Sequence, residues 1–271
     1  MSTTTEKAHS KLGASGYERW GVCPGSVAAS NGLPNLGSSY AREGSLAHKW
    51  AEKLLRGQAF IPEDYILEGE ELTEDQCDEM LEAVQVYLDH IADLRAQGPT
   101  FEAVEQAIDL SKYHPELFGT CDYVAYFAAT KTLHVVDYKH GRGIPKEPER
   151  SPQLMYYGVG ALHMNPVPIT RIVLTIVQPR CFHPKGPVRS WETDPVDMLD
   201  FLSQLIDDAK ATEVPNAPRV PGKEQCQFCL AAPTCSAASE RAMAVVTSGF
   251  KDETKEVVGQ YEQPAITPER L

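Results

Sequence analysis

The sequence predicts an α/β fold in which a mixed central sheet is flanked by helices. Segments rich in β-branched and aromatic residues gather in the middle of the chain, and amphipathic segments with helical spacing lie on both sides of them. With 42% hydrophobic residues, the 271-residue chain can also bury a sizeable core. We expect one domain over residues 1–245, followed by a mobile polar tail over residues 246–271.

The first third of the chain predicts three helices. Residues 15–30 open with Ser15, a good capping residue, and carry aromatic and thiol side chains at near-helical spacing. In residues 42–57, leucine and tryptophan recur at four-residue intervals. Residues 73–97 are strongly acidic but keep an apolar stripe, so a helix is expected there as well.

Strand patterns follow at residues 101–110, 121–129 and 133–141. The last two flank a polar Thr-Lys-Thr segment and predict an antiparallel hairpin. A helix, two strands and another helix are expected at residues 151–164, 171–180, near Trp191 and 195–210. A proline-rich linker then leads to a cluster of cysteines.

The predicted hairpin brings acids and a base together. Side chains alternate faces along a strand, so Asp137 and Lys139 point the same way. A turn near Thr130 and Lys131 would set Asp122 opposite Lys139. Neighbouring carboxylates resist joint ionisation unless a cation neutralises them, and oxygen ligands suit Mg²⁺ or Mn²⁺. We therefore expect a metal site for phosphodiester hydrolysis, in which Lys139 offsets negative charge.

The motifs EGSLAH, GTCDYV, VVDYKHG and QLMYYG, in this order, resemble those of the RecB-like branch of the PD-(D/E)XK nucleases. The resemblance covers residues 42–157 with gaps and implies a PD-(D/E)XK core. It also implies that His48, Asp122 and Asp137 are the Mg²⁺ or Mn²⁺ ligands, and that Lys139 is the catalytic lysine.

The resemblance further implies that Gln153 and Tyr157 line the DNA path, with Tyr156 as the neighbouring alternative to Tyr157. Their spacing of four residues puts Gln153 and Tyr157 on one helical face. Glu43 supports the helix that carries His48 or has no direct role. We expect Glu105, on the preceding strand, to be structural rather than a further acid at the metal.

Three of the seven cysteines form a C-x2-C-x5-C cluster, at Cys226, Cys229 and Cys235. In a reducing compartment this spacing indicates metal ligation rather than disulfides, and Cys23 is the best candidate for a fourth ligand. Both Zn²⁺ and [4Fe-4S] sites use four ligands. The arrangement resembles the iron-sulfur staple of AddB and of the CRISPR-associated exonucleases. It implies a [4Fe-4S] cluster joining the two ends of the chain, with structural Zn²⁺ as the alternative.

The net charge of −13 argues at first against a nucleic-acid partner. The charge is uneven, however. Residues 61–110 hold fifteen acids against one arginine, whereas residues 131–190 hold nine lysines or arginines against three acids. A chain that is basic around one site can still guide DNA to it.

These features predict a Mg²⁺- or Mn²⁺-dependent deoxyribonuclease, and the resemblance implies an exonuclease of phage or cellular recombination and repair. The chain has no Walker-type ATP-binding motif, so a helicase partner is one expectation. A single-strand annealing recombinase is the other, by resemblance to phage-encoded RecB-like nucleases. A catalytically silent DNA-binding or scaffold protein and an iron-sulfur regulatory protein remain alternatives, and the oligomeric state is open.

The sequence also bears on location. No apolar run is long enough for a membrane span, and the first residues lack the apolar core of a secretory signal. We therefore expect no membrane contact and a cytoplasmic protein, in the host cytoplasm if a phage encodes it.

Overall fold

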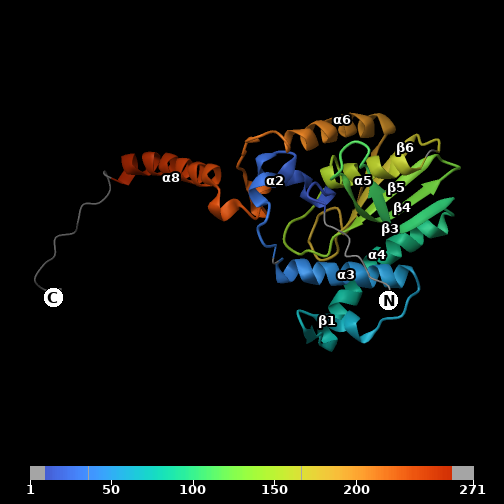
Figure 1. Cartoon of the computed structure of the whole chain (residues 1–271). Coiled ribbons are helices and arrows are strands. Elements are labelled where there is room, and N and C mark those ends of the chain that lie inside the picture. The colour runs from blue at the N-terminus through green and yellow to red at the C-terminus, as the bar shows by residue number, and fades with distance from the viewer. Residues whose placement is uncertain (1–9, 36, 166, 258–271) are drawn as a thin grey trace, which may run out of the picture.

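The computed structural model describes residues 10–35, 37–165 and 167–257, with side chains described as far as residue 247. It has an α/β architecture with a five-stranded sheet at its centre (Figure 1). The strands of this sheet, in spatial order, are β3 (Phe101–Asp109), β4 (Phe118–Phe127), β5 (Thr132–Tyr138), β6 (Arg171–Val177) and β7 (Val188–Thr193). Only the β5–β6 pairing is parallel, so the expected mixed sheet is confirmed.

Helices cover both faces of the sheet. The longer ones are α3 (Ser39–Leu55), α4 (Glu74–Ala96), α5 (Pro152–Met164), α6 (Pro195–Ala211) and α8 (Ser236–Val257). The short elements are η1 (Ala14–Gly16), α1 (Tyr17–Trp20), α2 (Gly25–Ser30), η2 (Pro62–Tyr65), α7 (Lys223–Gln227), η3 (Ala232–Thr234) and a small hairpin of β1 (Ile66–Leu67) and β2 (Glu70–Glu71). In the described part of the chain, no helix combines the length and apolar character needed to cross a membrane.

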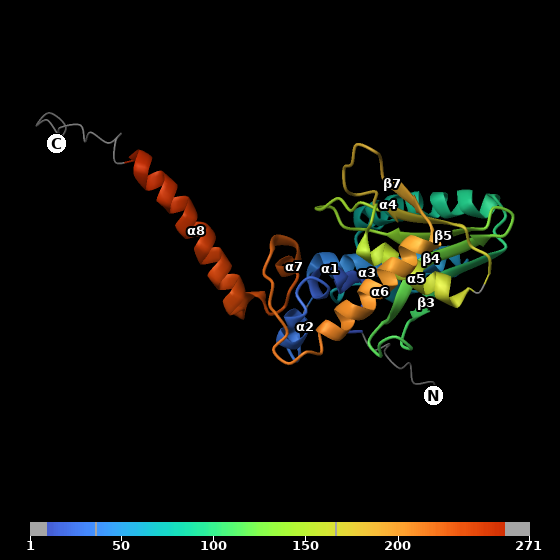
Figure 2. The same cartoon turned by 90° about the horizontal axis from the view of Figure 1, so that it is seen from above.

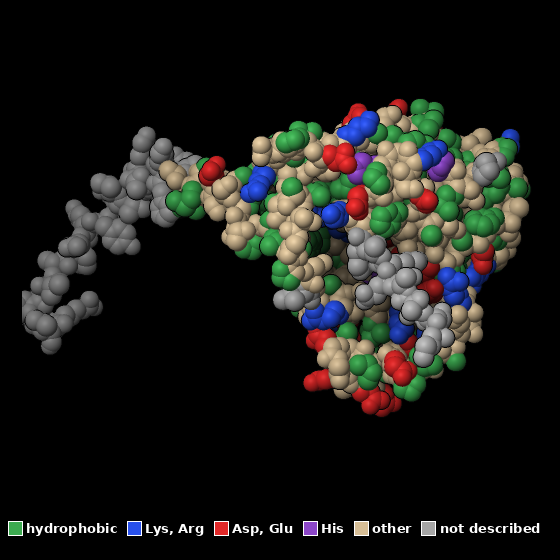
Figure 3. Space-filling model, viewed as in Figure 1, with side chains coloured by type: hydrophobic (Ala, Val, Ile, Leu, Met, Phe, Trp, Pro, Cys, Tyr) green, Lys and Arg blue, Asp and Glu red, His purple; other side chains and the backbone are tan. Residues whose placement is uncertain are grey.

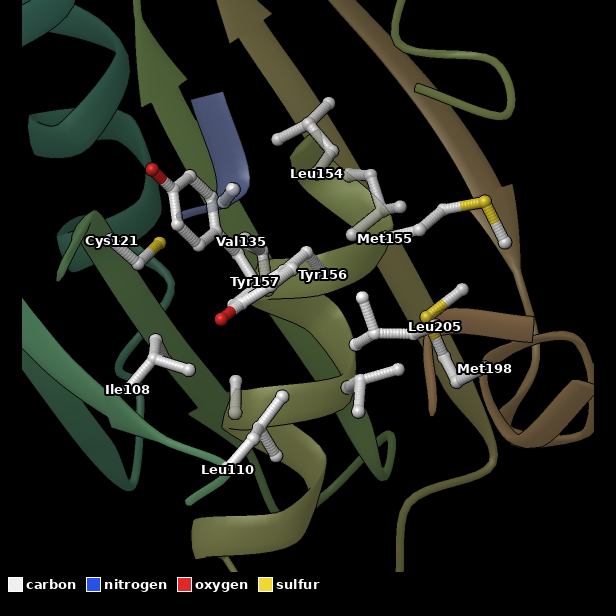
Figure 4. Close-up of a cluster of buried hydrophobic side chains, with 14 of the residues drawn as sticks. Ile108, Leu110, Cys121, Val135, Leu154, Met155, Tyr156, Tyr157, Met198 and Leu205 are labelled. Carbon is white, nitrogen blue, oxygen red and sulfur yellow. The ribbon is translucent and has the colours of Figure 1, made fainter. Parts of the chain in front are cut away.

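The core consists of two apolar clusters, one on each face of the sheet. On one face, α5 and α6 pack with the N-terminal helices around Trp20, which is fully buried. Figure 4 shows how α5 lies between the strands and Met198 and Leu205 of α6. On the other face, α3 and α4 pack around Trp50 and Tyr87. Burial of apolar area on both faces fixes the three-layer arrangement.

The helices that carry candidate site residues begin at side-chain caps. The Ser38 hydroxyl accepts a hydrogen bond from the Ala41 N–H at 3.1 Å, so α3 begins a few residues before the predicted start at residue 42. Ser151 caps α5 in the same way, and Pro152 occupies the first turn, where its missing N–H costs nothing. These caps fix where each helix begins above the sheet.

One prediction about the ends of the chain is corrected. Residues 15–30 do not form one helix, because Gly21 and Pro24 separate α1 from α2. Residues 246–257, which belong to the segment expected as a mobile polar tail, are part of helix α8, which extends away from the sheet and its helices (Figures 1 and 2). The stretch from residue 236 has no proline to stop the helix. Residues 258–271 lie outside the described part of the chain.

Candidate functional site

The candidate site lies in a fork between β4 and β5. The last paired residues of these strands are Tyr123 and Val136. Beyond them β5 stays paired with β6, while β4 stays paired with β3. The Tyr138 N–H then donates to Oδ2 of the Asp122 side chain at 2.6 Å, in place of a backbone acceptor. A carboxylate therefore bridges the two strands where their backbones separate.

The register corrects one detail of the predicted hairpin. Tyr123 pairs with Val136, so position 122 lies opposite Asp137 and not opposite Lys139. The turn is centred one residue earlier than expected, which shifts every partner by two positions. Because side chains repeat every two residues, this shift changes no face, and the acids and the lysine still meet.

The neighbouring strand β3 carries an irregularity at Glu105. This residue has a φ of 51° and is skipped in the otherwise continuous pairing with β4. Val104 packs on the α3–α4 side of the sheet, whereas Ile108, an even number of residues away, packs on the α5 side. The strand therefore changes face at Glu105. The register places this point directly opposite Asp122.

His48, Glu105 and Asp122 form a group of possible metal ligands. One ligand atom from each lies within 4.8 Å of the other two. His48 projects from α3, and its Nδ1 is 3.3 Å from Oδ1 of Asp122. Its ring also packs edge-on against Tyr138, with 5.3 Å between the ring centres. Two carboxylates and an imidazole at this spacing suit a divalent cation that accepts oxygen and nitrogen ligands.

Glu105 was expected to be structural. Its carboxylate, however, also lies within ligand distance of His48 and Asp122. The signal that would have found this role is the strand register. Strand β3 pairs antiparallel with β4 in a register that sets residue 105 opposite residue 122. Periodicity alone could not reveal that register, since it depends on how the two strands are joined.

A hydrogen-bonded network lies beside these ligands and joins Asp137, Lys139, Gln153 and Tyr157. Lys139 Nζ lies 2.9 Å from Asp137 Oδ2 and donates to Gln153 Oε1 at 2.7 Å. The Gln153 amide nitrogen donates to Asp137 Oδ1 at 3.1 Å and to the Tyr157 hydroxyl at 3.2 Å. Tyr156, the alternative to Tyr157, is fully buried, and its hydroxyl has no hydrogen-bond partner among the described residues. The geometry therefore favours Tyr157 as the partner of Gln153.

Asp137 is buried, and its charge is incompletely balanced. Burial raises the pKa of Asp137, Lys139 opposes this effect, and the neighbouring Asp122 carboxylate reinforces it. Oδ2 lies 2.9 Å from the Lys139 ammonium, and Oδ1 accepts a hydrogen bond from Gln153. A second cation beside Oδ2 would relieve this imbalance.

His48 and Asp122 shift each other's pKa in opposite directions. Burial would lower the pKa of His48, yet the carboxylates of Asp122 and Asp137 raise it to about 9. Burial would raise the pKa of Asp122, yet His48 and the Tyr138 N–H lower it. A protonated His48 thus supplies a positive charge next to the carboxylates. A bound divalent ion would neutralise the same carboxylates.

Glu43 is held away from the carboxylates. Its Oε1 accepts from Arg180 Nη1 at 2.6 Å and lies 3.4 Å from His140 Nε2. Arg180 also contacts His140, whose Nδ1 lies 2.8 Å from the Tyr138 hydroxyl. Burial lowers the pKa of His140, although Glu43 opposes the effect. Glu43 therefore ties α3 to the segment after β6, which is the supporting role considered for it.

Arg180 and His140 were not among the predicted site residues. Strands β5 and β6 are parallel neighbours, so the residues that follow their carboxyl ends lie side by side. This parallel pairing brings residue 180 next to residue 140. The sequence could have suggested that Arg180 lies near His140 only if β5 and β6 had been assumed to be parallel neighbours.

The four metal-binding candidates among the cysteines lie in segments that contact one another. Cys23 Sγ accepts a hydrogen bond from the Val220 N–H at 3.2 Å, and Cys226 Sγ accepts one from the Gly222 N–H at 3.4 Å. Cys229 Sγ is 3.9 Å from the Ser30 hydroxyl at the end of α2. Cys235 begins the turn that leads into α8. Within the described residues, no three of these sulfurs lie within 4.8 Å of one another.

The remaining cysteines were expected to pack as small apolar side chains. Cys121 and Cys181 are buried, in agreement with this expectation, and Cys77 is half-buried. Figure 4 shows Cys121 in the apolar cluster beside α5.

The basic residues expected around the site are largely paired with acids. Arg142 pairs with Glu79, and Lys146 pairs with Glu18, each at 2.7 Å. Acidic side chains gather at the end of the molecule that carries the β1–β2 hairpin (Figure 3). Of the lysines and arginines named here, Lys139 is the one that contacts the carboxylates of the fork, and its side chain is about one-quarter exposed.

A model of one protein family matches residues 9–268 and therefore nearly the whole chain. The family is described as "Protein of unknown function (DUF2800)" and is associated with phages. The match includes every candidate residue named above. The chain thus belongs to the DUF2800 family.

Proposed function

We propose that this protein is a metal-dependent deoxyribonuclease with a PD-(D/E)XK core of the RecB-like kind. One observation carries the proposal: the fork between β4 and β5 gathers His48, Glu105 and Asp122 within ligand distance, beside an Asp137–Lys139 pair. Acids that flank a lysine and converge on one partly buried point suit phosphodiester hydrolysis better than they suit a structural ion-pair network.

His48, Asp122 and Asp137 are the residues proposed to hold Mg²⁺ or Mn²⁺, with Glu105 as a further ligand or as the acceptor for a bound water. Asp137 is buried beside this group and is held by Lys139 and Gln153, which supports its assignment, although the three residues whose ligand atoms lie within 4.8 Å of one another are His48, Glu105 and Asp122. When bound, the metal would polarise the scissile phosphate and lower the pKa of the attacking water.

Lys139 is held in place by two acceptors. Asp137 and Gln153 both contact its ammonium, so the group is fixed before substrate arrives. From there it can orient the attacking water and stabilise the negative charge that develops on the phosphate. Gln153, which is itself held by Tyr157, fixes both members of the pair. We therefore assign Gln153 and Tyr157 to positioning, at the edge of the DNA path.

We also propose that Cys23, Cys226, Cys229 and Cys235 hold a [4Fe-4S] cluster, with Zn²⁺ as the alternative. Two of the sulfurs already accept backbone N–H hydrogen bonds, a contact that the sulfurs of iron-sulfur sites also make. A zinc tetrahedron would bring the sulfurs to about 4 Å from one another, from the usual Zn–S length. The preference for [4Fe-4S] over Zn²⁺ rests on the resemblance to the iron-sulfur nucleases.

The proposed substrate is DNA, attacked from an end. A helicase or a single-strand annealing recombinase would supply or use the single strands, and the phage association of the family supports the second partner. Both partners rest on the RecB-like resemblance.

The proposal is tested by digestion of end-labelled linear and circular DNA, single- and double-stranded, in Mg²⁺ and in Mn²⁺. We expect metal-dependent cleavage that falls about a hundredfold or more in Asp137→Asn and in Lys139→Ala. The matched control is Asp89→Asn. Asp89 is an exposed acid on α4 whose side chain contacts Gln85, far in sequence from the fork.

Unchanged cleavage in both site variants would refute the proposed mechanism. Metal-independent DNA binding without cleavage in the parent protein would instead support the silent scaffold reading.

A further inference from the structure

A cavity of about 560 Å³ opens on the α5 side of the sheet, next to the candidate site. It lies between β3, β4, α5 and the N-terminal segment around η1, and its walls include Ile108, Phe118, Gly119, Thr120 and Tyr157. Its volume is in the range of small-ligand pockets, so it can hold a group of the size of a nucleoside.

Tyr157 links the cavity to the hydrogen-bond network of the fork. Tyr157 forms part of the cavity wall, and its hydroxyl accepts a hydrogen bond from Gln153. The Gln153 amide in turn contacts both Asp137 and Lys139. Thr120, also in the wall, precedes Asp122 by two residues on β4. A strand whose phosphate lies at the carboxylates therefore has its neighbouring nucleoside within reach of the cavity.

The chemistry of the walls selects the neutral part of a nucleotide. None of the described residues that line the cavity is charged, in contrast to the fork beyond Tyr157. Phe118 and Tyr157 supply aromatic surface, and Ile108 and neighbouring small residues supply an apolar floor. Serine and threonine hydroxyls can bond to the edge of a base. A phosphate has no positive partner here, whereas a base gains from stacking.

Glycine at position 119 keeps the cavity open. A Cβ placed on Gly119 meets no atom within 4 Å, so a larger side chain there would project into free space. The residue has an ordinary φ and sits in β4 opposite Ile108. A leucine at this position would therefore fill the cavity and leave the backbone unstrained.

We propose that this cavity binds a nucleobase of the DNA strand, next to the scissile phosphate. The inference rests on the proposed nuclease function and extends it, because it assigns a base-binding subsite on the single strand. A base must leave the duplex stack to enter such a cavity, so the protein would prefer single-stranded or frayed ends.

The test is an abasic scan of a short single-stranded oligonucleotide. Binding is measured by fluorescence anisotropy in Mg²⁺ with Lys139→Ala, which retains the carboxylate and histidine ligands and leaves the DNA intact. We expect one abasic position, adjacent to the cleavage site mapped with the parent protein, to weaken binding roughly tenfold, the effect of one lost stacking contact.

The second measurement adds Gly119→Leu to the same background. This change should weaken binding of the intact oligonucleotide by a similar factor and abolish the effect of the abasic position. Ala92→Leu, an exposed change of similar size on α4, is the control and should bind like its parent. Circular dichroism and the unfolding midpoint of Gly119→Leu establish that the variant is folded, and the abasic scan tests the inference without this variant.

The outcomes separate the two proposals. If the parent cleaves DNA but no abasic position changes binding, the base-binding subsite is refuted and the nuclease assignment stands. Full sensitivity to the abasic position in folded Gly119→Leu would refute the cavity as its location. A parent protein that neither binds nor cleaves DNA would refute both.

Discussion

Asp64 is a carboxylate with no solvent exposure, held between two lysines of α3. Lys49 Nζ lies 2.7 Å from its Oδ1, and Lys53 pairs with Oδ2. The Ile61 N–H also donates to Oδ2 at 2.8 Å. Burial would raise the pKa of Asp64, but these donors lower it far below its usual value. The ion pairs anchor the η2 segment to the helix that carries His48.

Asp64→Asn should lower the free energy of unfolding at pH 7 by about 2–3 kcal/mol, because two lysines lose a buried partner. The lysines are partly exposed, which keeps the loss below that of a fully buried pair. A lowered folded-state pKa stabilises the fold above the unfolded value near pH 4, and this contribution is lost as the pH falls further. The difference between parent and variant should therefore shrink from pH 5 towards pH 2.

Urea unfolding at a series of pH values measures this difference. Glu63→Gln, which changes an exposed acid one residue away, should leave the unfolding curve unchanged. A constant parent–variant gap across the acid range would contradict the assigned pKa direction.

At the scale of elements, α5 packs closely against both the sheet and α6 at two of its glycines. A Cβ on Gly160 would lie 2.2 Å from Cγ2 of Ile108 in β3. A Cβ on Gly158 would lie 2.9 Å from the sulfur of Met198 in α6. The first neighbour is a stiff, fully packed β-branched side chain, and the second is the flexible end of a methionine.

Gly160→Ala should therefore destabilise the protein by about 1–3 kcal/mol, since the clash with Ile108 outweighs the gain in helix propensity. Gly158→Ala should change stability by less than about 1 kcal/mol, because Met198 can move aside and alanine favours the helix. Urea midpoints of the two variants measure the contrast. Equal losses in both would show that the contact with Ile108 does not limit the packing of α5.

The strands of the sheet were predictable from the sequence only in part. The alternating pattern located β4 and β5 and their hairpin, because one buried face imposes a period of two. The pattern did not fix the register, which shifted by two residues. It also gave no indication of the interruption at Glu105, because a positive φ at one glutamate leaves no trace in periodicity.

At the scale of the whole molecule, the N-terminal segment and the cysteine-bearing segment meet. Gly25 N–H donates to the Pro218 carbonyl at 3.0 Å, and a Cβ on Gly25 would lie 2.4 Å from the Ala217 carbonyl oxygen. Only glycine permits this approach. The contact brings Cys23 next to the linker that leads to Cys226, although about 200 residues separate the two in sequence.

Under the proposed cluster, Cys23→Ser and Cys226→Ser should each lower the free energy of unfolding by about 2–4 kcal/mol, because each opens a loop of about 200 residues. The double variant should lose no more than either single variant, since one metal group links both cysteines. Iron and zinc content, visible absorbance and the thermal midpoint are the measurements.

Cys77→Ser provides the control, as Cys77 lies on α4 and is outside the proposed cluster. Additive losses in the double variant, with no iron or zinc in the purified parent, would refute the shared metal group.

The sequence by itself determined the class of the fold and indicated most residues of the candidate site. The acids, the lysine and the histidine sit in short motifs, and the β-rich centre between amphipathic segments predicts a mixed α/β sheet, because local periodicity reflects which face of each element is buried.

The tertiary structure alone decided which of these residues meet. It brought Glu105 to His48 and Asp122, held Glu43 on Arg180, and placed an uncharged cavity behind Tyr157. Each of these contacts joins elements far apart in the chain. Their geometry depends on strand register and on the packing of α3 and α5 against opposite faces, which no local pattern of residues specifies.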